Sequence, residues 1–390
     1  MHRSRLGLTN IGVYGRFALA WAWLAAGSLC AAESLPRGGG PSAADAALFP
    51  PPPLPLVRDD RLGELNDRNS APKPAAESAA ATPADEHQFW LVNTRRLSSV
   101  PRDGQDAPEV RRYQSGAGWS DSSLDELLAA EAPQAATCVL VHGNHTDRQL
   151  AVSKGFEVYR TLVRGATNGQ PVRLIVWSWP SDQIPGSYRA DARAKARRTN
   201  VEAYYLAAFL DRLRGRYPVS LVGYSFGARV ITGSLHLLGG GALASRKLEP
   251  RDSSSRPPFH AVLLAAAVDH DWLLEGRPHG RALSAVERLV VLVNPQDRVL
   301  RWYRFLAPGE GSEALGSRGL PVSARTNVDR KKLVQINVSS AVGNRHGWTK
   351  YIGSTEIVKR LQQETLVETS RRRRDRTPAS SGTEVQAGGG

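Results

Sequence analysis

The chain has 390 residues, of which 41% are hydrophobic and 23% are charged, a composition typical of a globular protein with one large domain or two small ones. Its formal net charge of +14 favours anionic partners such as nucleic acid, lipid head groups or acidic polymers. The sequence has no zinc-finger pattern, RNA-binding signature or basic heptad, so we predict no specific nucleic-acid recognition and no bound metal.

The first 32 residues have the three parts of a secretory signal peptide. A basic head and a short apolar run precede two small residues, Ala31 and Ala32. The run is too short to span a bilayer, for which about 20 apolar residues are needed. We therefore expect cleavage near Ala32 and a secreted, periplasmic or cell-envelope location, with lipid modification at Cys30 as the alternative. After cleavage Cys138 is the one cysteine left, which excludes an intramolecular disulfide.

Two segments flank the predicted domain at residues 86–369. Residues 33–85 are rich in Ala, Pro, Gly and Ser and cannot bury enough apolar area to fold, which predicts a disordered spacer. Residues 370–390 contain the string RRRRDR and close on GGG, which predicts a disordered basic tail. An anionic surface is the partner that such a tail would contact.

Strand and helix signals alternate within the predicted domain. Continuous apolar runs predict strands at residues 89–93, 137–143, 172–180, 219–223, 259–268, 288–294 and 331–339. Apolar residues at helical spacing, or a following helical pattern, predict helices at residues 149–163, 189–214 and 226–238. Strands of this kind, separated by helices, indicate a mostly parallel sheet that is covered on both faces. We therefore predict a doubly wound α/β fold.

The string GYSFG at residues 223–227 is the first chemical signal, although chance can supply such a string. Here it follows a predicted buried strand and precedes a predicted helix. Ser225 would then sit on a tight, strained turn with its hydroxyl at the carboxyl edge of the sheet. We predict that Ser225 is a nucleophile, and the alternative is a serine that only caps the helix.

A serine hydroxyl needs a base that takes its proton. His346 lies in a glycine-flanked loop after the last predicted strand, and we predict that it is the base. His236 in a helix and His260 in a strand are expected to pack or to lie on the surface. His270 and His279 follow the strand at 259–268 and are less well placed.

The base in turn needs a carboxylate that holds its tautomer. Asp297 lies in the turn NPQDRVL, directly after the predicted strand 288–294, and is the predicted acid. Asp269 is the alternative, because it follows the preceding strand and some proteins take the acid from there.

Charge that develops on a carbonyl oxygen needs preorganised N–H donors. The backbone N–H of Phe226, directly after the nucleophile, is the first predicted donor. The backbone N–H of Asn144, in the turn HGN, is the second. His142 in the same turn is expected to brace the loop rather than to act as a base.

Five strings together resemble the α/β-hydrolase superfamily, and in particular a group of poorly characterised bacterial α/β-hydrolases: HGN, WSWPS, GYSFG, NPQDRVL and RHGW. They occur in the superfamily's order of Ser, Asp and His. The resemblance covers about residues 135–366 and implies a sheet of about eight strands, an acyl-enzyme mechanism and no cofactor. Many relatives carry His in place of Tyr224 and Met in place of Phe226, so the shape of their pocket does not transfer.

Lids in this superfamily commonly follow the sixth strand, where only about residues 269–287 are available, so we predict no large cap domain and a fairly open site. The aromatic residues near predicted strand ends could line an acyl pocket or simply pack, namely Trp179, Trp302, Tyr303 and Trp348. The expected protein is a secreted serine hydrolase that cleaves a small-molecule or polymer-linked carboxyl ester. A peptidase or an acyltransferase would use the same triad. A non-catalytic binding or cell-surface module is the alternative from a different class.

Overall fold

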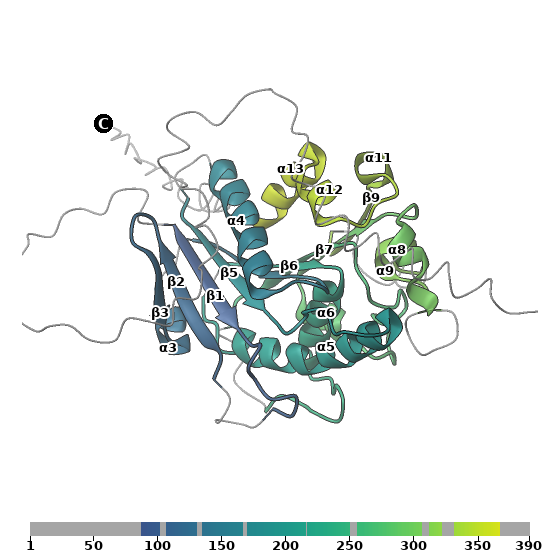
Figure 1. Ribbon diagram of the computed structural model, residues 1–390, viewed down its shortest axis with the longest axis horizontal. Helices are drawn as coiled ribbons and strands as arrows, with labels where there is room; N and C mark the ends of the chain where they lie inside the picture. The colour runs from purple at the N-terminus through teal and green to yellow at the C-terminus, as the bar shows by residue number, and fades with distance from the viewer. Residues whose placement is uncertain are drawn as a thin grey trace, which may run out of the picture.

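The computed structural model describes residues 87–101, 107–130, 135–166, 170–215, 217–249, 256–305, 312–321 and 331–366. The predicted signal peptide, the spacer and the basic tail lie outside these residues. The described chain is built on one nine-stranded sheet with helices packed on both faces (Figure 1). The prediction of an α/β fold is therefore confirmed.

The strands are β1 (Gln88–Asn93), β2 (Glu109–Gln114), β3 (Gly118–Ser122), β4 (Ala136–Val141), β5 (Val172–Ser178), β6 (Val219–Tyr224), β7 (Phe259–Leu264), β8 (Arg288–Val293) and β9 (Leu333–Asn337). They follow the spatial order β3-β2-β1-β5-β4-β6-β7-β8-β9. β1 and β4 to β9 are parallel to one another, whereas β2 pairs antiparallel with both β1 and β3. The sheet is therefore mostly parallel, as predicted.

The hairpin of β2 and β3 was not predicted, and with it the sheet has nine strands rather than about eight. Its sequences, EVRRYQ and GWSDS, are polar and mostly half-buried or exposed. The hairpin forms one edge of the sheet, where a strand does not need the continuous apolar run of a strand covered on both faces. The predicted strand at residues 259–268 is shorter than expected, because the chain leaves the sheet at Ala265, where φ is 48°.

The helices that cover the sheet are α4 (Arg148–Gly165), α5 (Tyr188–Leu210), α6 (Phe226–Leu238) and α13 (Thr355–Thr365). The short ones are α3 (Leu124–Ala129), α7 (Ala282–Ala285), α8 (Arg298–Arg301), the 3-10 helix η3 (Tyr303–Phe305), α9 (Leu315–Arg318), α11 (Ser339–Val342) and α12 (Trp348–Ile352). The three predicted helices correspond to α4, α5 and α6. Between β7 and α7 the chain forms turns and bends, with one isolated bridge from Asp269 to Ala314.

The strand order reverses between β4 and β6. β4 is followed through α4 by β5 on one side, whereas β6 and the later strands follow one another on the other side. Because crossovers between parallel strands are right-handed, crossovers that run in opposite directions place their helices on opposite faces. Figure 1 accordingly shows α4 and α13 on one face and α5 and α6 on the other. Open α/β sheets bind ligands outside the carboxyl ends of the strands at such a reversal, which here are the ends of β4 and β6.

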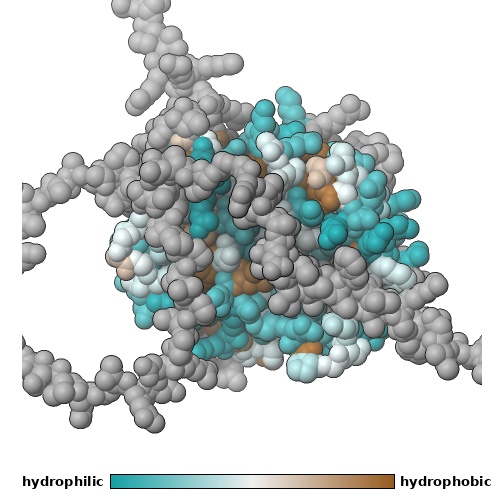
Figure 2. Space-filling model, turned by 45° about the horizontal axis from the view of Figure 1, so that its top comes forward, coloured by the Kyte–Doolittle hydropathy of each residue, from teal (hydrophilic) through white to brown (hydrophobic). Residues whose placement is uncertain are grey.

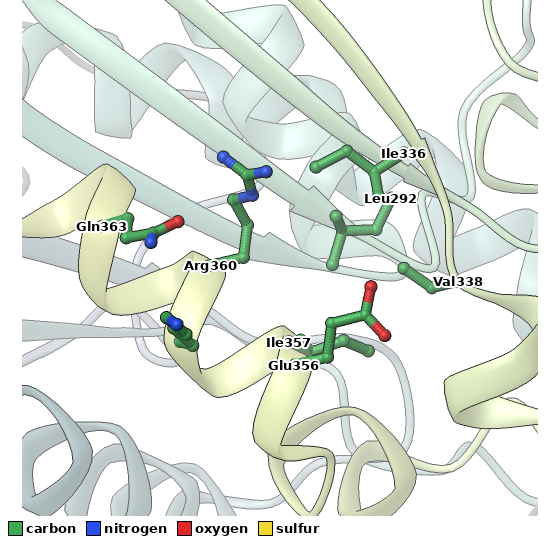
Figure 3. Close-up of a pocket in the computed structure, with 8 residues that line it drawn as sticks. Leu292, Ile336, Val338, Glu356, Ile357, Arg360 and Gln363 are labelled. Atoms are coloured by element: carbon green, nitrogen blue, oxygen red, sulfur yellow. The ribbon is translucent and has the colours of Figure 1, made fainter.

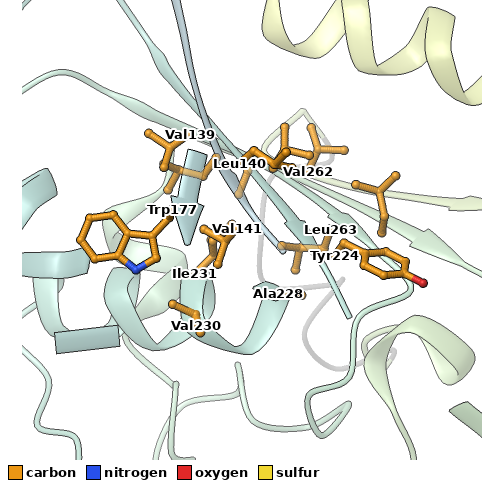
Figure 4. Packing of buried hydrophobic residues seen from close by; sticks show 14 of the residues in the cluster. Val139, Leu140, Val141, Trp177, Tyr224, Ala228, Val230, Ile231, Val262 and Leu263 are labelled. Atoms are coloured by element: carbon orange, nitrogen blue, oxygen red, sulfur yellow. The ribbon is translucent and has the colours of Figure 1, made fainter. Parts of the chain in front are cut away.

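α6 is buried along almost its whole length, because it lies between the sheet and α5. Its residues Ala228 and Ile231 lie near Val141 of β4 and Leu263 of β7 in the core (Figure 4). On the other side of the helix, a Cβ at Gly233 would lie 2.8 Å from the Cβ of Ala203 in α5. Close packing on both sides fixes the position of the N-terminus of α6 relative to the sheet.

Few large hydrophobic side chains reach the surface. Among the described residues only Val100 and Ile184 are exposed, and the uncovered part of the face in Figure 2 is largely hydrophilic with small hydrophobic areas. Within the same residues, no helix combines the length and the apolar character that crossing a bilayer requires.

Replacing Gly227 by Ala is expected to destabilise the fold. A Cβ at this position would lie 2.0 Å from the carbonyl oxygen of Val141 in β4, so that β4 and α6 would have to move apart. We expect a loss of about 3 kcal/mol in the free energy of unfolding, the upper part of the range for an overpacked core, measured by urea denaturation. Gly347→Ala is the matched control, because its Cβ would meet no atom closer than 3.9 Å. Equal stability of the two variants would contradict the packing argument.

Candidate active site

Ser225 occupies the turn between β6 and α6 in a conformation that L-residues rarely adopt, with φ 55° and ψ −119°. Hydrogen bonds hold its backbone there. Its N–H donates to the carbonyl of Leu264 at 3.0 Å, and its carbonyl accepts from the N–H groups of Ala228 at 3.0 Å and Ala267 at 3.2 Å. These hydrogen bonds hold Ser225 in a backbone conformation that costs about 1–3 kcal/mol. Residues in such conformations cluster at functional sites.

Ser225, His346 and Asp297 form one chain of hydrogen bonds. The Nε2 atom of His346 lies 3.1 Å from the Oγ atom of Ser225, and its Nδ1 atom lies 2.8 Å from the Oδ2 atom of Asp297. A carboxylate only accepts, so the proton of the neutral imidazole is on Nδ1. This tautomer leaves Nε2 as an acceptor that faces the serine hydroxyl. The structure therefore brings together the three residues that the sequence singled out.

The carboxylate of Asp297 is fully buried and has partners on both oxygens. Its Oδ1 atom accepts from the backbone N–H groups of Val299 at 2.9 Å and Leu300 at 3.0 Å, which makes Asp297 the N-cap of α8. Its Oδ2 atom is directed to His346. The capping bonds orient the carboxylate, so the turn that begins α8 also sets the direction of the imidazole.

Asp269, the alternative acid, belongs to a different network. It is not hydrogen-bonded to His346 in the described chain, and it interacts with Tyr303 and Arg229 instead. Arg229 donates from Nη1 to the hydroxyl of Tyr303 at 3.2 Å and lies 4.2 Å from the ring centroid of Trp272. Burial raises the pKa of Asp269. The geometry thus selects Asp297, rather than Asp269, as the partner of His346.

The other candidate histidines have partners away from Ser225. His279 is fully buried, with Nδ1 2.9 Å from the hydroxyl of Thr232. His236 lies 3.2 Å from the carbonyl of Ala242, and His260 lies 3.2 Å from a carboxylate oxygen of Glu287. The backbone N–H of His270 donates to the carbonyl of Glu313 at 2.9 Å.

The turn HGN after β4 packs directly against Ser225, since a Cβ at Gly143 would lie 2.9 Å from the Cβ of Ser225. Within the part of the chain that the structure describes, the backbone N–H groups of Asn144 and Phe226 donate to no other carbonyl. Phe226 is the first residue of α6, whose initial N–H groups have no partner inside the helix. Both N–H groups belong to residues next to the turn: Phe226 follows Ser225 in the chain, and Asn144 follows Gly143, which packs on Ser225.

His142 braces this turn, as predicted. Its Nε2 atom accepts from the backbone N–H of Trp179 at 3.2 Å, and its Nδ1–H donates to the carbonyl of Gly143 at 2.9 Å. The indole N–H of Trp179 donates to the carbonyl of His142 at 2.8 Å, and the two rings are stacked. Burial lowers the pKa of His142 well below its ordinary value, so the ring is neutral and structural.

Asp191, in the first turn of α5, holds the same loop from the other side and was not predicted. Its buried carboxylate accepts from Nδ2 of Asn144 at 3.3 Å and from the backbone N–H of Ile184 at 3.0 Å, and lies 2.8 Å from Nε2 of His145. Burial raises the pKa of Asp191, but these hydrogen bonds outweigh it, and the pKa is lowered overall. No local motif indicates such a residue, because two of its three partners, Asn144 and His145, lie more than 40 residues away in the chain.

The aromatic candidates for the acyl pocket are largely internal. Trp179 is fully buried against His142, and Tyr303 is buried and bonded to Arg229. Trp348 is buried, and its indole N–H donates to a carboxylate oxygen of Glu157 at 2.5 Å. These contacts favour the packing role for the three residues, and Trp302 alone of the four is partly exposed.

A groove between α13 and the strands β8 and β9 is separate from these residues (Figure 3). It is lined by Leu292, Ile336, Val338, Glu356, Ile357, Lys359, Arg360 and Gln363. None of the three bonded residues contributes to it, so we assign it no part in the chemistry. Among the described residues, no group of three or more His, Cys, Asp or Glu side chains is arranged to hold a metal ion.

No protein-family model and no curated protein sequence matches this chain.

Lys154 of α4 is a buried cation between the loop that follows β4 and the ring of Tyr224. Its ammonium donates to the hydroxyl of Thr146 at 3.0 Å and lies 5.7 Å from the ring centroid of Tyr224. Burial lowers its pKa from the ordinary 10.5 to about 8. Because the folded-state pKa lies below the unfolded one, the stability of the protein decreases as the pH falls from about 10.5 to about 8 and stays lower below that.

Lys154→Met is expected to increase the free energy of unfolding at pH 7. The pKa shift corresponds to about 3 kcal/mol, from which the lost hydrogen bond to Thr146 subtracts about 1 kcal/mol. Urea denaturation should show a gain of about 2 kcal/mol at pH 7 that disappears above pH 10.5. Lys350→Met, at an exposed position, should change neither value. An equal gain at both pH values would rule out buried charge as its cause.

Proposed function

We propose that this chain is a serine hydrolase of the α/β-hydrolase superfamily that cleaves carboxyl esters. The observation that carries the proposal is the chain of hydrogen bonds from Asp297 through His346 to Ser225. It lies at the carboxyl edge of a mostly parallel sheet, next to the reversal of strand order. The strained backbone of Ser225 between a strand and a helix is the second support, because a nucleophile elbow has this geometry.

The first step follows from the tautomer of His346. Its Nε2 atom takes the proton of the Ser225 hydroxyl as Oγ attacks the ester carbonyl, and the imidazolium that forms is stabilised by the carboxylate of Asp297. The N–H groups of Phe226 and Asn144 donate to the oxyanion. His346 then returns the proton to the departing alkoxide, which leaves an acyl group on Ser225.

The second half of the cycle uses the same groups. His346 takes a proton from a water molecule, whose oxygen attacks the acyl carbonyl. The proton then goes to Oγ of Ser225 as the acid product leaves. His346 carries every proton in these steps, and N–H groups of the chain stabilise the oxyanion. The proposed reaction therefore requires no cofactor.

The substrate proposal rests on the short connection after β7. Residues 269–281 form turns rather than a cap, which supports a fairly open site for a small-molecule or polymer-linked ester. Export from the cytoplasm remains part of the proposal and rests on the sequence of the first 32 residues, which lie outside the described chain.

A fluorophosphonate probe tests the nucleophile directly, because it forms a covalent bond only with an activated serine. The wild-type protein should be labelled at one site, identified by mass spectrometry as Ser225, and should hydrolyse a p-nitrophenyl ester. Ser225→Ala should lose both activities while its thermal midpoint stays close to that of the wild type. Folded wild-type protein that never reacts would refute the enzyme proposal and leave a binding module.

A comparison of Asp297→Asn with Asp269→Asn tests the acid. Asp297→Asn removes the charge that faces His346, so we expect kcat to fall by about 10³- to 10⁴-fold. Asp269→Asn alters a network that does not reach the base, and kcat should stay within about tenfold of the wild type. Thermal midpoints of both variants control for folding. A larger loss from Asp269→Asn would reassign the acid.

A further inference from the structure

Tyr224 is the last residue of β6 and directly precedes Ser225 in the chain. Its side chain is buried, and its hydroxyl donates to the backbone carbonyl of His346 at 2.5 Å. The residue before the nucleophile is therefore hydrogen-bonded to the main chain of the base. None of the steps proposed for ester cleavage uses this contact.

The ring of Tyr224 is held on several sides. The ring of Trp348 meets it edge-on at a centroid distance of 5.3 Å, and the rings of His346 and Tyr351 lie at 5.6 and 6.2 Å. The ammonium of Lys154 lies 5.7 Å from its centroid. Burial, followed by the electrostatic interactions with Tyr351 and Asp297, raises the pKa of Tyr224 well above its ordinary value, so the hydroxyl keeps its proton. The hydroxyl of Tyr224 is thus a hydrogen-bond donor in a fixed position.

The loop that carries His346 has a second attachment, which comes from the turn of the acid. Nδ2 of Asn294 donates to the carbonyl of Gly343 at 2.8 Å, and the N–H of Arg298 donates to the carbonyl of Asn344 at 3.2 Å. These bonds hold the beginning of the loop, two or three residues before His346. At His346 itself, the hydroxyl of Tyr224 is the one donor to the main-chain carbonyl among the described residues.

We propose that Tyr224 is a positioning residue for the base, which fixes the main chain of His346 at a set distance from Ser225. The inference rests on the proposed function and adds to it the contact that sets the distance over which the proton moves from Ser225 to His346. Because Tyr224 and Ser225 share a peptide bond, one hydrogen bond links the base to the nucleophile through covalent geometry. The contact of 3.1 Å between Nε2 and Oγ depends on that link.

Removing the hydroxyl should loosen the link without emptying the cavity that the ring fills. In Tyr224→Phe the buried carbonyl of His346 loses its donor. The loop keeps the bonds at Gly343 and Asn344, and the imidazole keeps its contacts, but the main chain of His346 is no longer fixed. A displacement of the reacting groups by about 1 Å is enough to cost up to about 100-fold in rate. Substrate contacts are untouched by this change, so kcat should fall and KM should not.

The test compares Tyr224→Phe with Tyr159→Phe. Tyr159 is a buried tyrosine of α4 whose ring packs edge-on against Phe89, away from the three bonded residues. Three quantities are measured for both variants: the rate of fluorophosphonate labelling, kcat and KM for a p-nitrophenyl ester, and hydrogen–deuterium exchange of residues 343–350. For Tyr224→Phe we expect labelling and kcat to fall about 10- to 100-fold, KM within twofold, and faster exchange in this segment. Tyr159→Phe should match the wild type in all three.

Labelling, kcat and exchange that equal the wild-type values would overturn the role of Tyr224 and leave the hydrolase proposal intact. A loss of activity that accompanies loss of folded protein by circular dichroism would also overturn it, because the hydroxyl would then serve the fold. If the wild type itself never reacts, the proposed hydrolase activity fails. The exchange of residues 343–350 then decides the positioning role alone, with faster exchange supporting it and unchanged exchange overturning it.

Discussion

The close approach of the turn at Ser225 to the end of β4 is the constraint on which the rest of the site depends. Gly227 faces the carbonyl of Val141, and Gly143 faces Ser225, each at a distance that leaves no room for a Cβ. The positive φ of Ser225 follows from this approach, because the chain must turn from β6 into α6 within one residue. Phe226 and Asn144, whose N–H groups have no backbone partner in the described chain, directly adjoin these two glycines. The strained turn at Ser225 therefore depends on glycine at both points of contact.

The other parts of the site are each held by contacts of their own. Asp297 is oriented by its helix cap, through the N–H groups of Val299 and Leu300. The turn HGN, which packs on Ser225, is held by the carboxylate of Asp191 and by the bond between His142 and Trp179. Such over-determination is what maintains a strained residue, since each contact removes a way in which the turn could relax.

The parts of the fold that could be predicted are those that a short stretch of sequence determines. Buried parallel strands appear as apolar runs, and the elbow, the acid turn and the loop of His346 follow directly after them, so Ser225, Asp297 and His346 could all be named. The hairpin of β2 and β3 could not, because an edge hairpin of polar residues has no such run. Asp191 and Lys154 were missed for another reason. Their partners lie in other loops and in β6, and only the folded chain brings them together.

The charged side chains that are buried near the site reduce the stability of the fold. Lys154 is buried without a carboxylate partner within ion-pair distance in the described chain, and its pKa is lowered to about 8. Asp269 and Arg229 are buried as well and meet through Tyr303 rather than directly. Buried groups of this kind reduce stability, because removing a charge from water is repaid only in part. Charges are also buried away from Ser225, at Arg173 of β5 and at Glu202 of α5. The burial of charge, with its cost in stability, is therefore a feature of the whole sheet and not of the turn at Ser225 alone.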